Sequence, residues 1–159
     1  MTAKSDFDTD DWARIVRAPM MAGLAITLAD PGGPIEAAKE TMATMRSATT
    51  PPSREQLLSD VALDVQEMVQ HKQNPLKDYR PSKESPAGDQ VIAELREVHD
   101  LVAAKATPEE SAAFGVWLLT SAQAAADAAK EGGFMGFHAV RISEREQAML
   151  DRLRETVAA

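Results

Sequence analysis

The stretch TPEESAAFGVWLLTSAQAAADAAK, residues 107–130, decides the fold of this chain. Thr107 can cap a helix, Pro108 suits the first helical position, and Glu110 can return a hydrogen bond to the cap. Four polar side chains share one narrow stripe of this helix: Thr120, Gln123, Asp127 and Lys130. Most of the helix surface must therefore be buried, and its many alanines let neighbouring helices approach closely. The stretch predicts a central, alanine-rich helix.

On the carboxyl side, the sequence predicts one more helix. Gly132 and Gly133 end the central helix, since glycine is common just past a helix end. Ser143-Glu144-Arg145-Glu146 is a capping box, in which Ser143 and Glu146 satisfy each other's backbone amides. The helix that follows turns three apolar side chains inward: Met149, Leu150 and Leu153.

On the amino side, the sequence predicts two helices, one before and one after a cluster of helix-breaking residues. Thr9 can cap the first, which reaches Leu28 and which Pro19 should kink or split. The second covers about 34–47. Its predicted inward face is the helically spaced set Ile35, Ala38, Met42 and Met45.

Two further helices lie on either side of a long connection. A capping box at residues 53–56 opens one of them, with Leu58, Val61, Val65 and Met68 on its apolar face. The other has the apolar face Val91, Leu95, Val98 and Val102. Residues 72–88, rich in proline, predict a long loop between them.

The fold class is therefore all-α, a compact bundle of about six helices around the alanine-rich one. No run of alternating β-branched residues predicts a strand. Residues 1–8 show no apolar pattern and are predicted to form a flexible tail. Residues 9–159 are predicted to be a single helical domain, a size that one domain accommodates.

Composition excludes several classes of protein. The 159 residues hold 17 Lys+Arg against 25 Asp+Glu and no cysteine. A formal charge of −8 argues against nucleic-acid binding, which needs cations to neutralise phosphates. The longest nonpolar run, residues 18–29, would span only about 18 Å as a helix, too short to cross a bilayer. We expect a cytoplasmic protein that does not bind a membrane and has no cofactor.

One set of polar side chains has spacing suitable for a divalent metal. Asp60, Asp64, Glu67 and His71 fall on one face of their helix, where carboxylates and an imidazole could gather an ion. That face lies opposite the apolar stripe, so a solvated acidic face is the simpler interpretation. His99 touches the apolar stripe of the next helix and is either a hydrogen-bonded boundary residue or a further ligand.

A second candidate site follows the central helix. The segment Gly132–Arg141 holds three glycines and two phenylalanines. Five of its residues are candidate ligand or partner contacts: Phe134, Met135, Phe137, His138 and Arg141. The rings can plug the end of the bundle, face a partner, or flank an anion held by backbone amides and the arginine. The segment matches no nucleotide-binding motif.

The region from residue 114 to 146 resembles a pattern in small uncharacterised bacterial proteins. The resemblance rests on Trp117-Leu118-Leu119, on Ala128-Ala129-Lys130-Glu131-Gly132-Gly133-Phe134, on Gly136-Phe137, and on Ile142-Ser143-Glu144. His138 stands where that pattern usually has glycine. The resemblance implies a bacterial, cytosolic, helical protein and no known activity.

These observations favour a non-enzymatic helical protein that self-associates or binds a protein partner. The alternative is a small-ligand or metal-binding bundle, which abundant methionine could provide with an adaptable apolar cavity. The sequence contains no recognisable nucleophile motif, which favours a protein that is not an enzyme. Exposed apolar side chains near Phe134, Met135 or Phe137 would favour the partner. A cavity lined by Met and Phe, or carboxylates converging on His99, would favour the ligand.

Overall fold

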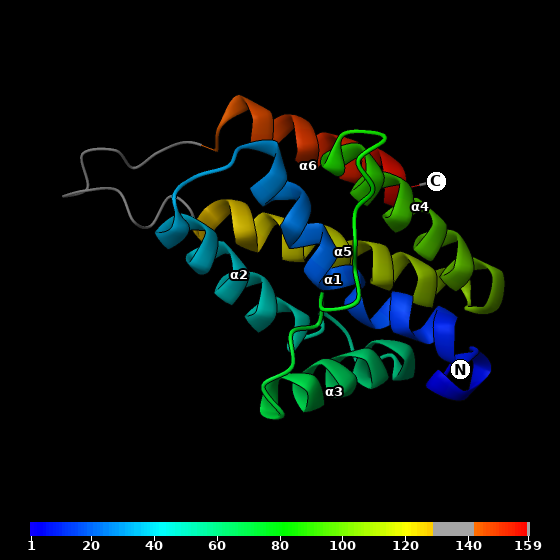
Figure 1. Ribbon diagram of the computed structural model, residues 1–159. Coiled ribbons are helices and arrows are strands. Elements are labelled where there is room, and N and C mark those ends of the chain that lie inside the picture. Colours follow the sequence, from blue (N-terminus) through cyan, green and yellow to red (C-terminus); the bar gives the residue numbers. More distant parts are fainter. Residues whose placement is uncertain (129–141, 159) are drawn as a thin grey trace.

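The computed structural model describes residues 1–128 and 142–158, and within them the chain is an all-α bundle without strands (Figure 1). A short 3-10 helix, η1 (Lys4–Asp6), precedes six α-helices. These are α1 (Thr9–Ala29), α2 (Pro34–Ala48), α3 (Gln56–Gln70), α4 (Ala87–Lys105), α5 (Pro108–Ala128) and α6 (Glu144–Val157). None of these helices is both long enough and apolar enough to span a membrane.

Two helices, rather than one, occupy the centre. The predicted central helix α5 packs against all five others, and so does α1. In Figure 1 they lie across the middle, with α4 and α6 above and with α2 and α3 below. The side chains of Trp117, Phe114 and Leu118 on α5 are fully buried, as are Ile15 and Met21 on α1. The apolar contacts of α1 and α5 therefore form the core.

Helix α1 begins at Thr9, one residue earlier than predicted, and is continuous across its proline. Asp8, not Thr9, is the cap, and its carboxylate accepts a hydrogen bond from the amide of Asp11 at 2.8 Å. Pro19 is buried inside a continuous helix. Of the two predicted outcomes, a kink or a split, the split was wrong, because packing on all sides offsets the hydrogen bond that proline removes.

The amino-terminal arm, residues 1–8, is packed against the bundle, in contrast to the flexible tail that the sequence predicts. Thr2 is 5% exposed and Phe7 8%. The Thr2 amide and hydroxyl both donate to the carboxylate of Glu110, at 2.8 and 2.6 Å. Lys105 donates to the carbonyl of Asp6 at 2.7 Å. Glu110, which lies 108 positions after Thr2, therefore helps to hold the arm, and no local sequence pattern predicts this contact.

The predicted capping box of α5 is confirmed and is the anchor for this arm. The Glu110 carboxylate accepts from the Thr107 amide at 2.9 Å, and the Thr107 hydroxyl accepts from the Glu110 amide at 3.1 Å. Hydrogen bonds from Thr2, stronger than the opposing effect of burial, lower the pKa of Glu110 to about 2, and the Thr107 amide helps. The capping box of α6, between Ser143 and Glu146, is confirmed as well.

The capping box predicted at residues 53–56 is wrong. Helix α3 starts at Gln56, its cap residue is Glu55, and no side chain caps it. The Ser53 hydroxyl is buried without a hydrogen-bond partner among the described residues. The inward face is largely as predicted, since Leu58, Val61 and Val65 are fully buried.

Helix α2 has nearly the predicted bounds but presents the opposite face to the core. Ile35 and Met42, predicted inward, are 73% and 64% exposed, whereas Glu40 and Thr44 are buried. Met45, also predicted inward, is partly buried and packs against the core. The Glu40 carboxylate accepts a hydrogen bond from the Thr27 hydroxyl of α1. Burial raises the pKa of Glu40, against the opposing effect of that hydrogen bond. Polar partners on neighbouring helices therefore override the apolar stripe.

A close approach of α1 and α2 explains why the small polar face is the buried one. A Cβ atom added at Gly23 of α1 would lie 2.8 Å from the Cβ of Thr44. On the α5 side, the indole of Trp117 donates to the carbonyl of Ser47 at 2.8 Å, and the Ser47 and Ser121 hydroxyls lie 2.9 Å apart. Isoleucine and methionine would not fit between backbones this close.

The long connection between α3 and α4 is tied to the bundle at several points. Pro75 is buried, and the partly buried Leu76 and Tyr79 pack against the core. Gln90 of α4 binds the backbone of Ser82 through both its oxygen and its nitrogen, at 2.8 and 2.9 Å. Helix α4 begins at Ala87, just inside the predicted loop of residues 72–88.

We predict that Gly23→Ala lowers the free energy of unfolding by about 1–3 kcal/mol, the usual cost of overpacking a tight contact. Thr44 is attached to the helix at the clashing atom and cannot turn away. The matched control is Gly88→Ala, whose added Cβ would meet only the mobile methyl end of Met149 at 3.3 Å. Urea denaturation should show the control unchanged or up to about 1 kcal/mol more stable from helix propensity. Equal effects of the two substitutions would contradict the close approach.

We predict that Glu110→Gln destabilises the protein at pH 7 and that the difference disappears in acid. The pKa of Glu110 is about 2 in the folded protein, below its ordinary value, so its stabilisation is present above pH about 4.5 and is lost as the pH falls toward 2. Urea denaturation at pH 7, 4 and 3 measures the difference. Glu109→Gln, at an exposed neighbouring carboxylate, is the control. A pH-independent difference between wild type and Glu110→Gln would refute the assignment.

Candidate functional site

A cleft lies between the amino-terminal arm, α1 and α3 in the described part of the chain. We call it the α1–α3 cleft; its volume is about 690 Å³. This volume lies within the range of about 300–1,000 Å³ typical of small-molecule sites. The cleft is lined by Lys4, Ser5, Phe7, Asp8, Thr9, Trp12, Ala13, Val16, Arg17, Asp64, Glu67, Met68, His71, Gln73, Pro75 and Asp78.

Two aromatic rings form one side of this cleft. The ring centroids of Phe7 and Trp12 are 5.8 Å apart, and their planes are inclined by 34°. The ammonium of Lys105 lies 5.4 Å from the centroid of Phe7. Val16, one turn after Trp12 on α1, and Met68 on α3 extend the apolar lining. The cleft therefore has an apolar floor built mainly from α1.

Asp64 joins the arm, α1 and α3 at the edge of the cleft. Its carboxylate accepts from the indole of Trp12 at 2.7 Å and pairs with the ammonium of Lys4 at 2.8 Å. The Lys4 amide donates to Asp60 at 3.0 Å. The hydrogen bond from Lys4 to Asp64 raises the pKa of Lys4, with Glu67 and Asp60 adding to the effect. These contacts fix both the Trp12 ring and the wall of the cleft.

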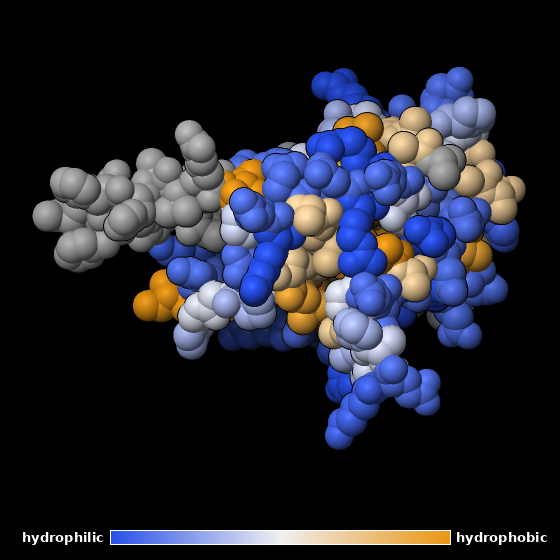
Figure 2. Space-filling view, turned by 90° about the horizontal axis from the view of Figure 1, so that it is seen from above, coloured by the Kyte–Doolittle hydropathy of each residue, from blue (hydrophilic) through white to orange (hydrophobic). Residues whose placement is uncertain are grey.

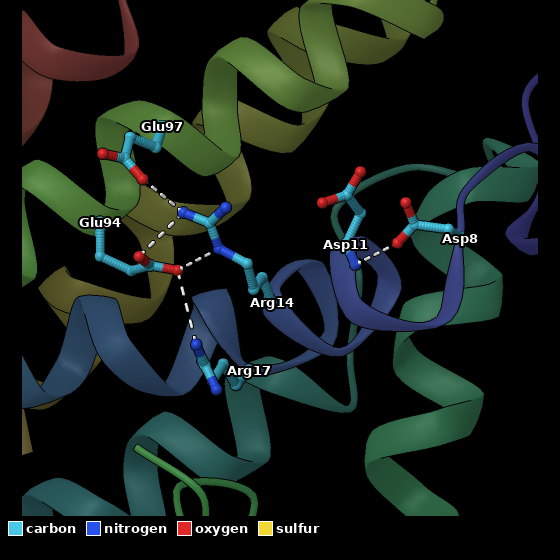
Figure 3. Close-up of polar contacts among 6 residues, drawn as sticks. All are labelled: Asp8, Asp11, Arg14, Arg17, Glu94 and Glu97. Atoms are coloured by element: carbon cyan, nitrogen blue, oxygen red, sulfur yellow. Dashed lines mark hydrogen bonds and ion pairs between the residues drawn. The ribbon is translucent and has the colours of Figure 1, made fainter. Parts of the chain in front are cut away.

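An arginine–glutamate network supports the α1 side of the cleft from behind (Figure 3). Arg14 binds both oxygens of Glu94, at 2.7 and 2.9 Å, and pairs with Glu97 at 2.6 Å. Arg17 lies 3.6 Å from Glu94, and its guanidinium lies over the ring of Tyr79 at 5.9 Å. Burial would raise the pKa of Glu94, but the hydrogen bonds and charges of the two arginines lower it. Arg17 thus shares Glu94 with Arg14, and its Nε is buried without a hydrogen-bond partner among the described residues.

The metal candidates do not all come together. Asp64, Glu67 and His71 line the cleft, but His71 directs Nδ1 to the backbone carbonyl of Glu67 at 2.8 Å and Asp64 is bound to Trp12 and Lys4. His99 is buried on α4, away from the cleft lining, and its Nε2 lies near Gly115 of α5. In residues 1–128 and 142–158, no group of three or more His, Asp or Glu side chains is arranged to hold a metal.

The candidate contacts Phe134, Met135, Phe137, His138 and Arg141 lie outside the described residues, as do Gly132 and Gly133. The described neighbour of that segment is Ala128, the last residue of α5. Ala128 lines a surface hollow of about 280 Å³ with Lys39, Met42, Ala43 and Arg46 of α2. A second hollow of about 450 Å³ continues it toward Thr120 and Ala124.

We call these two adjoining hollows the α2–α5 groove. Small side chains of both helices line it, and Met42 stands at its edge. Figure 2, which shows the face seen from above in Figure 1, has separate hydrophobic patches among mostly hydrophilic residues. Exposed Ile35 and Met42 differ from such scattered residues because they lie two turns apart on one helix.

Sequence reasoning missed the cleft because four of its sixteen lining residues belong to the arm that was predicted to be flexible. Asp64, Glu67 and His71 were chosen as candidates for a different reason, their shared helix face. A signal was present in Phe7 and Trp12, two large rings next to an acidic helix start, but no local pattern connects them with α3.

Searches with this chain against protein-family models, curated proteins and solved structures found no match. The resemblance to small uncharacterised bacterial proteins stays a prediction.

Proposed function

We propose that this chain is a non-enzymatic helical protein that binds a protein partner through the α2–α5 groove. The observation that supports the proposal is the exposed apolar face of α2, of which Met42 lines the groove and Ile35 lies two turns earlier, outside the lining. Ile35 is 73% exposed and Met42 64%, at i and i+7, with the small Ala38 between them. Such spacing suits an amphipathic helix that lays its own apolar stripe into a groove.

The charges around this face favour an acidic partner. Lys39 and Arg46 are exposed on either side of Met42 along α2, and neither forms an ion pair with another described residue. Asp127 lines the α5 side of the groove. A partner helix with acidic residues beside its apolar stripe would place them next to the lysine and the arginine.

Self-association is the other form that such binding can take. Direct pairing of two α2 faces would bring Lys39 and Arg46 of each copy close to the same residues of the other, which costs free energy. A second copy would instead have to offer one of its acidic surfaces, which a chain of net charge −8 has in excess. The groove therefore fits a contact between unlike surfaces better than a symmetric one.

The test uses two amphipathic peptides of about 15 residues, long enough to form a helix on binding. They share one apolar stripe and carry either glutamate or lysine elsewhere. We expect the acidic peptide alone to shift the backbone amide signals of α2 and α5. Ile35→Gln and Met42→Gln should each weaken its binding roughly tenfold, as loss of an apolar anchor does.

The matched control is Leu63→Gln, since Leu63 is 60% exposed on α3 and should not affect binding. Equal binding of both peptides, or signal shifts confined to other helices, would contradict the proposal. Light scattering of the unbound protein addresses the second copy. A mass of 17.2 kDa indicates a monomer awaiting a partner, and a mass twice as large supports self-association.

A further inference from the structure

We propose that the α1–α3 cleft is a second binding site, separate from the groove, and that it takes a small organic cation: an ammonium group attached to an apolar or aromatic body. The proposal rests on three features of the described residues. These are an aromatic floor, an excess of carboxylates at the rim, and cations that are already paired.

The floor suits an apolar body. Trp12 and Phe7 are joined by Val16 and Met68 in the lining. Aromatic faces bind both apolar groups and cations, and the ammonium of Lys105 already lies 5.4 Å from the centroid of Phe7. The indole N–H of Trp12 is bound to Asp64 at 2.7 Å, so the ring is held in one orientation. A ligand therefore meets a preorganised surface, which lowers the entropic cost of binding.

The rim carries more negative than positive charge. Four carboxylates line the cleft: Asp8, Asp64, Glu67 and Asp78. The lining has two permanent cations, Lys4 and Arg17. Each already faces a carboxylate, because Lys4 pairs with Asp64 at 2.8 Å and Arg17 lies 3.6 Å from Glu94.

The remaining carboxylates are available to a ligand. Glu67 and Asp78 are exposed, and among the described residues neither side chain is in an ion pair. The Asp8 carboxylate accepts the amide of Asp11 at 2.8 Å. The ammonium group of a ligand bound against Trp12 would lie next to these carboxylates, which attract it. An anionic ligand of the same shape would be repelled.

Glu67 is the residue on which we base the test. It is exposed on α3, one turn after Asp64, so its replacement leaves the bonds of Trp12 intact. The probes are 4-phenylbutylamine, 4-phenylbutanol and 4-phenylbutanoate, which share an apolar body and carry a positive, a neutral and a negative end. Binding is followed by the indole N–H signals of ¹⁵N-labelled protein, in which Trp117, fully buried and bonded to Ser47 at 2.8 Å, is the internal control.

We expect the amine to shift the Trp12 signal saturably, to leave the Trp117 signal in place, and to bind roughly tenfold more tightly than the alcohol, with the carboxylate weakest. Glu67→Gln should weaken the amine several-fold and leave the alcohol unchanged. Glu155→Gln, at an exposed carboxylate of α6, is the control for net charge. The preference for the amine should shrink as salt is added, because the rim is exposed.

Two results would overturn the inference. Equal binding of amine and alcohol would show that the rim does not select charge, and the absence of any shift at Trp12 with all three probes would show that the cleft takes no ligand of this class. Neither result bears on the groove, whose residues lie on α2 and α5. The peptide experiment and this one therefore fail independently.

Discussion

The burial of α1 and α5 against each other is the constraint on which the rest of the structure depends. Neither helix has a polar side broad enough to face water, so each needs neighbours on nearly every side. The other four helices supply them, and each touches both central helices. Pro19 is tolerated inside α1 for this reason, since a fully packed helix can lose one backbone hydrogen bond and remain continuous. The position of the cleft and of the groove follows from where this enclosure is incomplete.

The sequence predicted the number and approximate bounds of the helices well, because long periodic segments and the capping boxes at Thr107 and Ser143 are local signals. It predicted the wrong face of α2, because the partner of a helix decides which side is buried. The hydrogen bond from Thr27 to Glu40 and the close approach at Gly23 are contacts between helices, and neither is visible in the period of α2. Ser53 does not cap α3 although its motif is suitable, because a motif forms a cap only where the backbone enters the helix at the right residue.

The candidate sites could be predicted only in part. Asp64, Glu67 and His71 share the helix face that was predicted, but the face is covered on one side by the arm instead of pointing wholly to water. The residues that turn it into a cleft, Phe7 and Trp12, come from a segment more than fifty positions away. No spacing rule connects such segments, because their contact depends on the tertiary fold. The groove was missed for the same reason as the buried face of α2.

The anchor of the arm has a consequence for the order of assembly. Every residue that lines the α1–α3 cleft lies between positions 4 and 78, yet the arm is tied down by Glu110, 108 positions after Thr2. A fragment that contained the whole lining would therefore keep the contacts of Lys4 with Asp60 and Asp64 but lack the carboxylate that binds Thr2. During synthesis, Glu110 can bind the arm only after the start of α5 has left the ribosome. The cleft therefore reaches its final form late, although its lining lies in the first half of the chain. The contact of Thr2 with Glu110 closes a loop of 108 positions, at an entropic cost that grows only slowly with loop length.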